Sequence, residues 1–257
     1  MVSTKEEILK AACKLGRCIQ ENGGEIYRVE QSIGYFMRAY GIENAEIFAI
    51  PATIIVTITD DDGKPITKVE RVKSISQNMY RLDKANDLSR WICDNKPEMS
   101  VIYEKLDEIK KGPKMTQNQL MIAFGIASGF FAYFWGGDTG DAITAFLVGV
   151  ATQRCWRFVT KYQSNVFFSN LISSIVIGAC SVIGIELNIG HDIDMIISGA
   201  IMTLVPGISI TNVMRDIISG DIITGATKIV EVLLIALAIA IGVAMPLSLY
   251  TALGGII

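Results

Sequence analysis

A polar segment interrupts the strongly apolar second half of the chain and holds residues suited to bind a small anion or carry a proton. Residues suited to bind an anion come first in this segment: Pro206 and Gly207 precede a run of backbone amides, and Thr211, Asn212 and Arg215 carry side-chain donors. Carboxylates that can take up and release a proton follow them: Asp216, Asp221 and Glu231. Polar residues inside an apolar helical bundle mark pathways by default, so we treat this segment as the candidate site.

Pro206 predicts a broken helix, because proline removes one backbone hydrogen bond and clashes with the preceding turn. Inside a bilayer the freed backbone groups must be satisfied by protein, water or a bound molecule. The half-helix that starts after the break would direct amide groups and a positive dipole end toward an anion. The alternative is that Pro206 only kinks a membrane helix and that Arg215 and Asp216 mark its cytosolic end.

A second motif lies near the N-terminus, where Gly23 and Gly24 precede Arg28, Val29 and Glu30. The spacing of apolar residues predicts a helix here, with Glu30 on or beside its buried face. A carboxylate in that position needs a partner or a raised pKa. We interpret Glu30 as a structural group that forms an ion pair or hydrogen bond within its domain, rather than as a catalytic group.

Together the two motifs resemble the signature of the bacterial threonine/serine exporter family. The later motif reads P-G-x-x-x-T-N-x-x-R-D-x-x-x-G-D and is followed by Gly225 and Glu231, and the earlier one reads G-x-x-x-x-R-V-E. Two motifs in the right order are more specific than either alone. The resemblance covers nearly the whole chain and is closest to the long subunit of the split, two-gene members.

The resemblance implies a subunit of an exporter that moves small hydrophilic metabolites, driven by the proton gradient. The substrates it implies are amino acids such as threonine and serine, or dicarboxylates such as succinate. It also implies a partner, because split members pair the long subunit with a short membrane protein in a hetero-oligomer. A carboxylate-bearing substrate would fit the donors around Arg215, with a proton carried by one of the carboxylates that follow.

Composition predicts two domains. The chain has 257 residues, of which only 19% are charged, and most of the charges precede residue 114. We therefore expect a cytosolic α+β domain at 1–114 and a transmembrane helical domain at 115–257. The net charge of −3 gives no reason to expect nucleic acid. No apolar run follows the N-terminus, so we expect no signal peptide.

The first domain is predicted to contain a sheet between helices. Alternating residues predict one strand over 48–58, with Pro51 at an edge or bulge, and a returning strand over 66–72 after an acidic turn at 60–62. Helices are expected at 78–95 and 100–110. The domain has no Walker loop, Rossmann fingerprint or nucleophile elbow, so we expect no cofactor. Five scattered cysteines form no C-x-x-C pair, so we expect neither a disulfide nor a metal.

The second domain is predicted to contain about five membrane-spanning helices. The apolar segments lie at 120–135, 142–156, 166–185, 193–212 and 230–249. Arg154, Arg157 and Lys161 make the second connection basic, whereas the first and third connections are acidic. Because basic loops face the cytoplasm, this alternation predicts a protein of the bacterial inner membrane with its N-terminus inside and its C-terminus outside.

Small residues in the first and third spans predict close helix packing, and one histidine suggests a second proton site. The small residues are Gly125, Ser128, Gly129, Ser173, Ser174 and Gly178. His191 could gate protons together with Asp192 and Asp194, or be an ordinary exposed loop residue.

Two other functions remain open. The chain could be a membrane-anchored enzyme whose chemistry lies in the first domain, at Arg28, Glu30 and Thr53. It could also be a regulatory or scaffold protein that binds a cytosolic partner through that domain. Against the enzyme, an anchor needs only one span, and the polar segment at 206–231 would have no purpose. We therefore expect a transport protein without a catalytic site.

Overall fold

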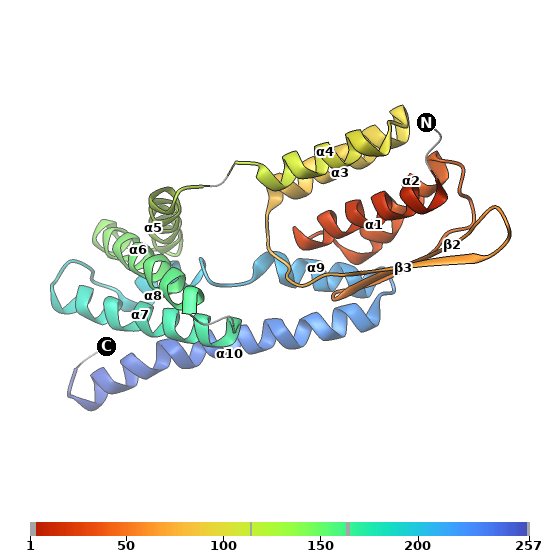
Figure 1. The fold of residues 1–257 in the computed structure, drawn as a ribbon. Helices are drawn as coiled ribbons and strands as arrows, with labels where there is room; N and C mark the ends of the chain where they lie inside the picture. Colours follow the sequence, from red (N-terminus) through yellow and green to blue (C-terminus); the bar gives the residue numbers. More distant parts are fainter. Residues whose placement is uncertain (1–3, 114, 163–164, 256–257) are drawn as a thin grey trace. The chain divides into compact units, whose positions relative to one another are not determined.

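The computed structural model describes residues 4–113, 115–162 and 165–255, and Figure 1 shows its fold. The chain divides into two compact units. The first unit comprises residues 1–113 and 212–227, and the second comprises residues 114–211 and 228–257. The predicted domain boundary at residue 114 lies outside the described residues.

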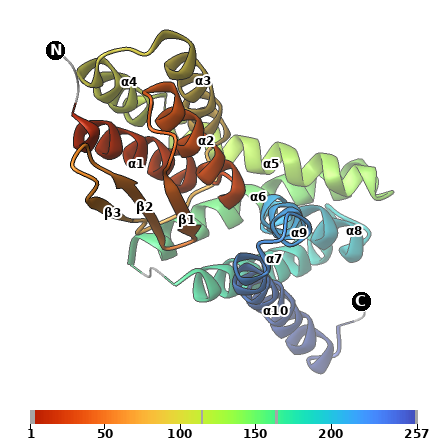
Figure 2. The ribbon, with the colours of Figure 1, turned by 90° about the vertical axis from the view of Figure 1, so that its right-hand side faces the viewer.

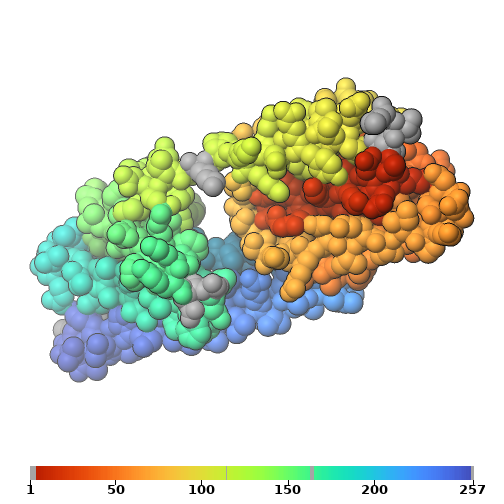
Figure 3. Space-filling view, in the orientation of Figure 1, coloured from red at the N-terminus to blue at the C-terminus, as the bar shows by residue number. Residues whose placement is uncertain are grey.

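The first unit is built from helices packed on a small antiparallel sheet. Its elements are α1 (Lys5–Glu21), α2 (Ile26–Ala39), β1 (Glu46–Ile50), β2 (Thr53–Thr59), β3 (Pro65–Arg71), α3 (Met79–Asn95) and α4 (Met99–Lys111). Helices α1 and α2 lie between the sheet on one side and α3 and α4 on the other (Figures 1 and 2). In the space-filling view α1 is bordered by α4 and by the strands (Figure 3).

The helix ends follow from the sequence. Thr4 caps α1, because its hydroxyl accepts the Glu7 amide at 3.2 Å and the Glu7 carboxylate accepts the Thr4 amide. Asn78 caps α3 through the amide of Arg81 at 3.0 Å. The predicted helices at 78–95 and 100–110 are confirmed, with α3 and α4 within a residue of those bounds.

The single strand predicted over 48–58 is wrong, because the structure has two strands there. Ile50 pairs directly with Thr53, so Pro51 and Ala52 form a two-residue turn and β1 and β2 make a hairpin. The alternation of apolar residues continued across the turn and concealed it. The turn also reverses the buried face of β1, so that Ala49 is buried while Phe48 is exposed. The hairpin between β2 and β3 is confirmed, with its tip at 60–64.

The core of the first unit forms where α1 and α2 face β2. Ile54, Val56 and Ile58 alternate along β2 and are buried against the helices. Cys13 and Cys18 of α1 are also buried, and burial raises the pKa of these thiols to about 12 and about 11. They therefore stay protonated and pack as small apolar side chains.

The second unit is a helical bundle. Its helices are α5 (Gln117–Phe134), α6 (Thr139–Tyr162), α7 (Val166–Glu186), α8 (Ile193–Ile201), the first part of α9 (Gly207–Ile218) and most of α10 (Ile222–Ala252). Glycines allow close approach: a Cβ on Gly149 would lie 2.4 Å from the Ser128 hydroxyl, and one on Gly178 would lie 2.9 Å from the Val243 carbonyl. The predicted packing role of the small residues in α5 and α7 is confirmed at these positions.

The apolar segment at 193–212 is interrupted. Helix α8 ends at Ile201, residues 202–204 form a turn, and α9 begins directly after Pro206. The expected break at Pro206 is therefore present. With nine residues, α8 is about 14 Å long, well short of a hydrocarbon layer of about 30 Å.

Two described helices, α7 and α10, are long and apolar enough to cross a membrane. The other predicted spans correspond to α5, to α6, and to α8 with α9. Helix α6 continues to Tyr162, beyond the predicted end at 156, and α10 begins at Ile222 rather than 230. Both differences have one cause: hydropathy falls at charged residues such as Arg157 and Lys228, but an α-helix can continue through them.

Gly24 offers a test of the packing between α1 and α2. A Cβ there would lie 2.5 Å from the Cγ2 atom of the buried Ile19 and 3.0 Å from the Ile19 carbonyl. We expect Gly24→Ala to lower the free energy of unfolding by about 1–3 kcal/mol through overpacking. The measurement is the unfolding midpoint of the full chain in detergent.

Gly34→Ala is the matched control. Gly34 lies inside α2, where a Cβ would make ordinary contacts at 3.5 Å or more. Because alanine favours a helix interior, this variant should be neutral or more stable by up to about 1 kcal/mol. Equal unfolding midpoints for the two variants would contradict the packing argument.

Candidate functional site

Part of the polar segment belongs to the same compact unit as the N-terminal motif. The division between the units falls inside α9, so Asn212, Arg215 and Asp216 belong to the first unit. Pro206, Gly207 and Thr211 belong to the second unit. The Thr211 hydroxyl donates to the carbonyl of Gly207 at 3.1 Å, so its proton is used within its own helix.

Within the first unit, the two motifs meet in an ion pair. The Arg215 guanidinium of α9 contacts the carboxylate of Glu25, which lies 190 positions earlier in the chain. The other carboxylate oxygen of Glu25 lies 3.3 Å from Nε of Arg28. The Glu25 side chain is only 10% exposed, so two arginines compensate a nearly buried negative charge.

Backbone geometry explains how Glu25 reaches this position. Gly23 has a φ of 92°, a left-handed conformation that glycine adopts without strain, and it turns the chain sharply after α1. Glu25 then occupies the N-cap position of α2 in an extended conformation. The positive end of the α2 dipole therefore adds to the stabilisation of its carboxylate.

Asn212 makes a second contact between the motifs. Its side-chain amide donates to the carbonyl of Gly23 at 3.3 Å. Asn212 and Arg215 are separated by one helical turn, so both side chains reach the chain reversal at 23–25 from one face of α9. The predicted donors Asn212 and Arg215 are thus brought together with the N-terminal motif.

Glu30 lies close by and has a structural partner. Its carboxylate accepts the amide of Ala49 at 2.7 Å, which satisfies a backbone donor on the edge strand β1. Burial raises the pKa of Glu30, and the negative charge of Asp221 raises it further, while the hydrogen bond from Ala49 opposes the shift. The prediction that Glu30 forms a hydrogen bond within its domain is therefore confirmed.

The three predicted proton carriers lie in different surroundings. Asp216 is fully buried on α9. The amide of Asp221 donates to the carbonyl of Asp216 at 2.9 Å, closing the end of α9. Glu231 is exposed on α10 and belongs to the second unit. These positions set Asp216 apart as the buried carboxylate of the set.

Thr53 does not join this group. It lies at the start of β2, where it pairs with Ile50 and Arg71 in the sheet. In the part of the chain that the structure describes, its side chain makes no hydrogen bond to Arg28 or Glu30. The geometry therefore gives no catalytic arrangement to these three residues.

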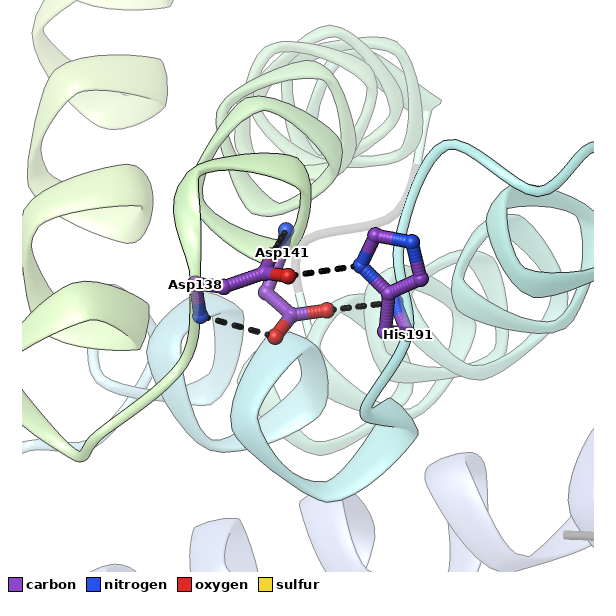
Figure 4. A group of neighbouring side chains, drawn as sticks. All are labelled: Asp138, Asp141 and His191. Atoms are coloured by element: carbon purple, nitrogen blue, oxygen red, sulfur yellow. Dashed lines mark hydrogen bonds and ion pairs between the residues drawn. The ribbon is translucent and has the colours of Figure 1, made fainter.

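The second unit contains a separate polar cluster at the start of α6 (Figure 4). Asp138 and Asp141 cap each other's amides at 3.0 and 2.9 Å. The buried carboxylate of Asp141 also accepts the amides of His191 and Asp192 at 2.7 and 2.9 Å. The His191 ring contacts Asp138 at 2.7 Å, so the cluster joins the start of α6 to the loop between α7 and α8.

Of the two interpretations of His191, the one that groups it with Asp192 and Asp194 does not match the structure, because the ring contacts Asp138. Asp192 instead caps α8 through the amides of Asp194 and Met195, and Asp194 is exposed. Asp138, Asp141 and His191 have ligand types that a divalent metal accepts, with candidate atoms within 4.8 Å of one another. Their carboxylate oxygens are already engaged by amides or by the histidine ring, so the cluster acts as a structural clasp.

Sequence reasoning missed three residues that organise these sites. Glu25 follows the Gly-Gly pair and precedes a helix, which is the position of an N-cap residue. Asp138 and Asp141 have the spacing of a capping box at the start of α6. These local signals were available, but the partners of the side chains lie far away in sequence.

Comparison with known proteins identifies the family. Residues 10–250 match the family described as "Putative threonine/serine exporter" (ThrE). The chain therefore belongs to this family of transport proteins, as the two motifs predicted. A transporter family also agrees with the prediction that the chain is not an enzyme.

Three curated relatives resemble the chain at low identity. "Threonine/serine exporter" of Corynebacterium glutamicum is 21% identical over 249 residues, which cover 94% of this chain and 51% of the relative. "Probable threonine/serine exporter" of Mycobacterium tuberculosis is 21% identical over 94% of this chain and 46% of its own length. "Probable succinate transporter subunit YjjP" of Klebsiella aerogenes is 22% identical, over 91% of this chain and 92% of its own.

The chain spans about half the length of the two threonine/serine exporters that it matches, but nearly the whole length of the succinate transporter subunit. No solved structure matches the chain.

Asp141 provides a test of the clasp. Replacing it with asparagine turns an acceptor oxygen into a donor that faces backbone amides, at a position that is 2% exposed. We expect Asp141→Asn to lower the free energy of unfolding by about 1–3 kcal/mol. The exposed Asp194→Asn is the control and should change it by less than about 0.5 kcal/mol. Matching unfolding midpoints for these two variants would rule out the clasp.

Proposed function

We propose that the chain is a subunit of an exporter of small hydrophilic metabolites that carry a carboxylate. The candidate substrates are amino acids of the threonine and serine type, or dicarboxylates such as succinate. Export is driven by the proton gradient. The substrate meets the protein at the interrupted helix and α9, where Pro206 and Gly207 start the half-helix, Thr211 lies in its first turns, and Asn212 and Arg215 supply side-chain donors.

One observation carries this proposal: Arg215 holds a carboxylate. The group bound to it is the side chain of Glu25, and the Arg215 side chain remains 45% exposed. A guanidinium presents a planar fork of donors that matches a carboxylate. Threonine, serine and succinate, which occur in the names of the relatives, share a carboxylate as their common chemical group.

Asp216 is the best candidate for the coupling proton. It follows Arg215 directly and is fully buried on α9. Its position beside Arg215 places a buried carboxylate within the proposed substrate segment. Asp221 and Glu231 are less enclosed and are the remaining candidates.

The membrane arrangement that we propose has five crossings, made by α5, α6, α7, α8 with α9, and α10. The clasp between Asp138, Asp141 and His191 supports it, because the clasp holds two acidic connections at one end of the second unit. The opposite end of α6 carries Arg154, Arg157 and Lys161. Basic ends face the cytoplasm, so the clasp would face outside and the N-terminal domain inside.

A second, short membrane subunit completes the exporter in this proposal. The support is the length comparison: the matched exporters are about twice as long as the region that they share with this chain. The relative that matches along nearly its full length is itself named a subunit. The rest of the longer exporters would correspond to a separate partner chain here.

The first experiment measures efflux from cells loaded with labelled threonine, serine or succinate. The chain is expressed alone and together with a short membrane protein encoded beside it. We expect efflux only with both proteins, and we expect it to stop when an uncoupler removes the proton gradient. Absence of efflux in both arrangements, with both proteins present in the membrane, would reject the exporter assignment.

A second experiment tests the proton carrier. Asp216→Asn cannot ionise, so we expect it to lose gradient-driven efflux but to retain exchange of labelled for unlabelled substrate. Asp94→Asn, on the exposed face of α3, is the control and should retain both activities. Normal gradient-driven efflux by Asp216→Asn would exclude Asp216 as the carrier and leave Asp221 and Glu231.

A further inference from the structure

The carboxylate of Glu25 occupies the place on Arg215 that a substrate carboxylate would need. Its two oxygens contact different arginines, one on α9 and one on α2. The two sides of the ion pair differ in access, because the Glu25 side chain is 10% exposed and that of Arg215 is 45% exposed. A small anion from solution can therefore approach Arg215 although Glu25 is nearly buried.

We propose that Glu25 is an internal competitor that a carboxylate-bearing substrate displaces from Arg215, and that this exchange releases α9 from the chain reversal at 23–25. The inference rests on the proposed function in taking the substrate as a carboxylate. It assigns to Glu25 the role of a gate on the substrate site. No substrate role for Glu25 follows from the sequence motif itself.

The exchange is chemically balanced, since one carboxylate replaces another on the same guanidinium. When Arg215 is taken by a substrate, Glu25 keeps Arg28 at 3.3 Å and the positive end of the α2 dipole. The buried charge of Glu25 is therefore never left without compensation, which would be strongly unfavourable. Arg28 thus acts as a positioning residue that makes the displaced state accessible.

A second contact between the motifs is weaker than the ion pair and can open with it. It is the neutral hydrogen bond from the Asn212 side chain to the Gly23 carbonyl at 3.3 Å. A neutral hydrogen bond contributes less than a charge-assisted one. Displacing Glu25 removes the stronger of these two contacts and so weakens the attachment of α9 to the chain reversal at 23–25.

The ion pair of Glu25 and Arg215 also predicts which solutes can displace Glu25. A carboxylate competes with Glu25 for the guanidinium, whereas an uncharged amide of the same shape does not. Succinate and threonine should therefore open the contact, and succinamide, which has no carboxylate, should not. Glutamate should act as well, because its side chain repeats that of Glu25.

Hydrogen exchange on the full-length wild-type chain in nanodiscs tests this directly. The amides of Arg28 and Val29, which donate to the Glu25 carbonyl at 3.1 Å, report the first turn of α2. We expect saturating succinate to speed exchange in residues 22–30, and succinamide to leave it unchanged. Unchanged exchange in succinate would overturn the proposal without needing any variant.

Efflux kinetics provide a second test of the proposal, beside hydrogen exchange. In Glu25→Gln the side chain at position 25 is neutral and competes less for Arg215. The state in which Arg215 is free to bind a substrate is then no longer a minor one. If that state holds 10% or less of the wild-type population, the substrate concentration for half-maximal efflux should fall about tenfold or more. Glu21→Gln is the control, because Glu21 pairs with Arg17 instead, and it should leave this concentration unchanged.

The two arms separate this inference from the proposed function. Normal wild-type efflux with no effect of Glu25→Gln on the half-maximal concentration would overturn the gate and leave the exporter intact. Absence of wild-type efflux would overturn the exporter, and the exchange experiment would still decide whether carboxylates displace Glu25. Faster exchange in succinate together with a lower half-maximal concentration for Glu25→Gln supports both.

Discussion

The nearly buried carboxylate of Glu25 is the constraint on which the candidate site depends. A charge removed from water is strongly unfavourable unless opposite charges and hydrogen bonds replace the water. Here Arg28 from α2 and Arg215 from α9 supply them. The need to compensate one anion therefore joins two motifs that lie at opposite ends of the chain, and it explains why residues 212–227 are compact with the N-terminal elements.

The glycines before Glu25 serve the same constraint. The left-handed conformation of Gly23 reverses the chain, and Gly24 allows close contact with Ile19 of α1. Larger residues would move the start of α2 away from α1, and the carboxylate would move with it. The Gly-Gly-Glu sequence therefore sets both the packing of α1 against α2 and the position of the charge on Glu25.

Much of the fold could be predicted from local sequence, because local rules set it. Helical spacing predicted α3 and α4, and Pro206 predicted the break before α9. The strand over 48–58 was mispredicted, because the apolar alternation runs unbroken through the turn at Pro51. The ends of α6 and α10 were misplaced, because hydropathy reports the preference for lipid and not the end of a helix.

The candidate site was less predictable, because its contacts are distant in sequence. The motif residues Asn212 and Arg215 were recognised, but nothing local indicates that Arg215 pairs with Glu25. The partner of His191 was also missed, since Asp138 lies 53 positions away and nearer carboxylates were available. Charged side chains choose partners through the tertiary fold, so a single sequence indicates which residues need a partner but not which partner they find.

Two carboxylates in this chain illustrate the difference between a fixed and an exchangeable anion. Asp141 is held by backbone amides of Asp138, His191 and Asp192, and it is too buried for any solute to reach. Amides fixed in the backbone cannot turn to another acceptor without unfolding the loop, so this anion is suited to hold a structure.

Glu25 is held instead by two long, flexible arginine side chains, both of which are almost half exposed. A guanidinium can exchange one carboxylate for another at little cost in energy, because the incoming group restores the same hydrogen bonds. The chemistry of the donors, more than the strength of the contact, therefore determines which anion can be exchanged for another. By that criterion the ion pair of Glu25 and Arg215 is suited to change during transport, and the clasp at Asp141 is not.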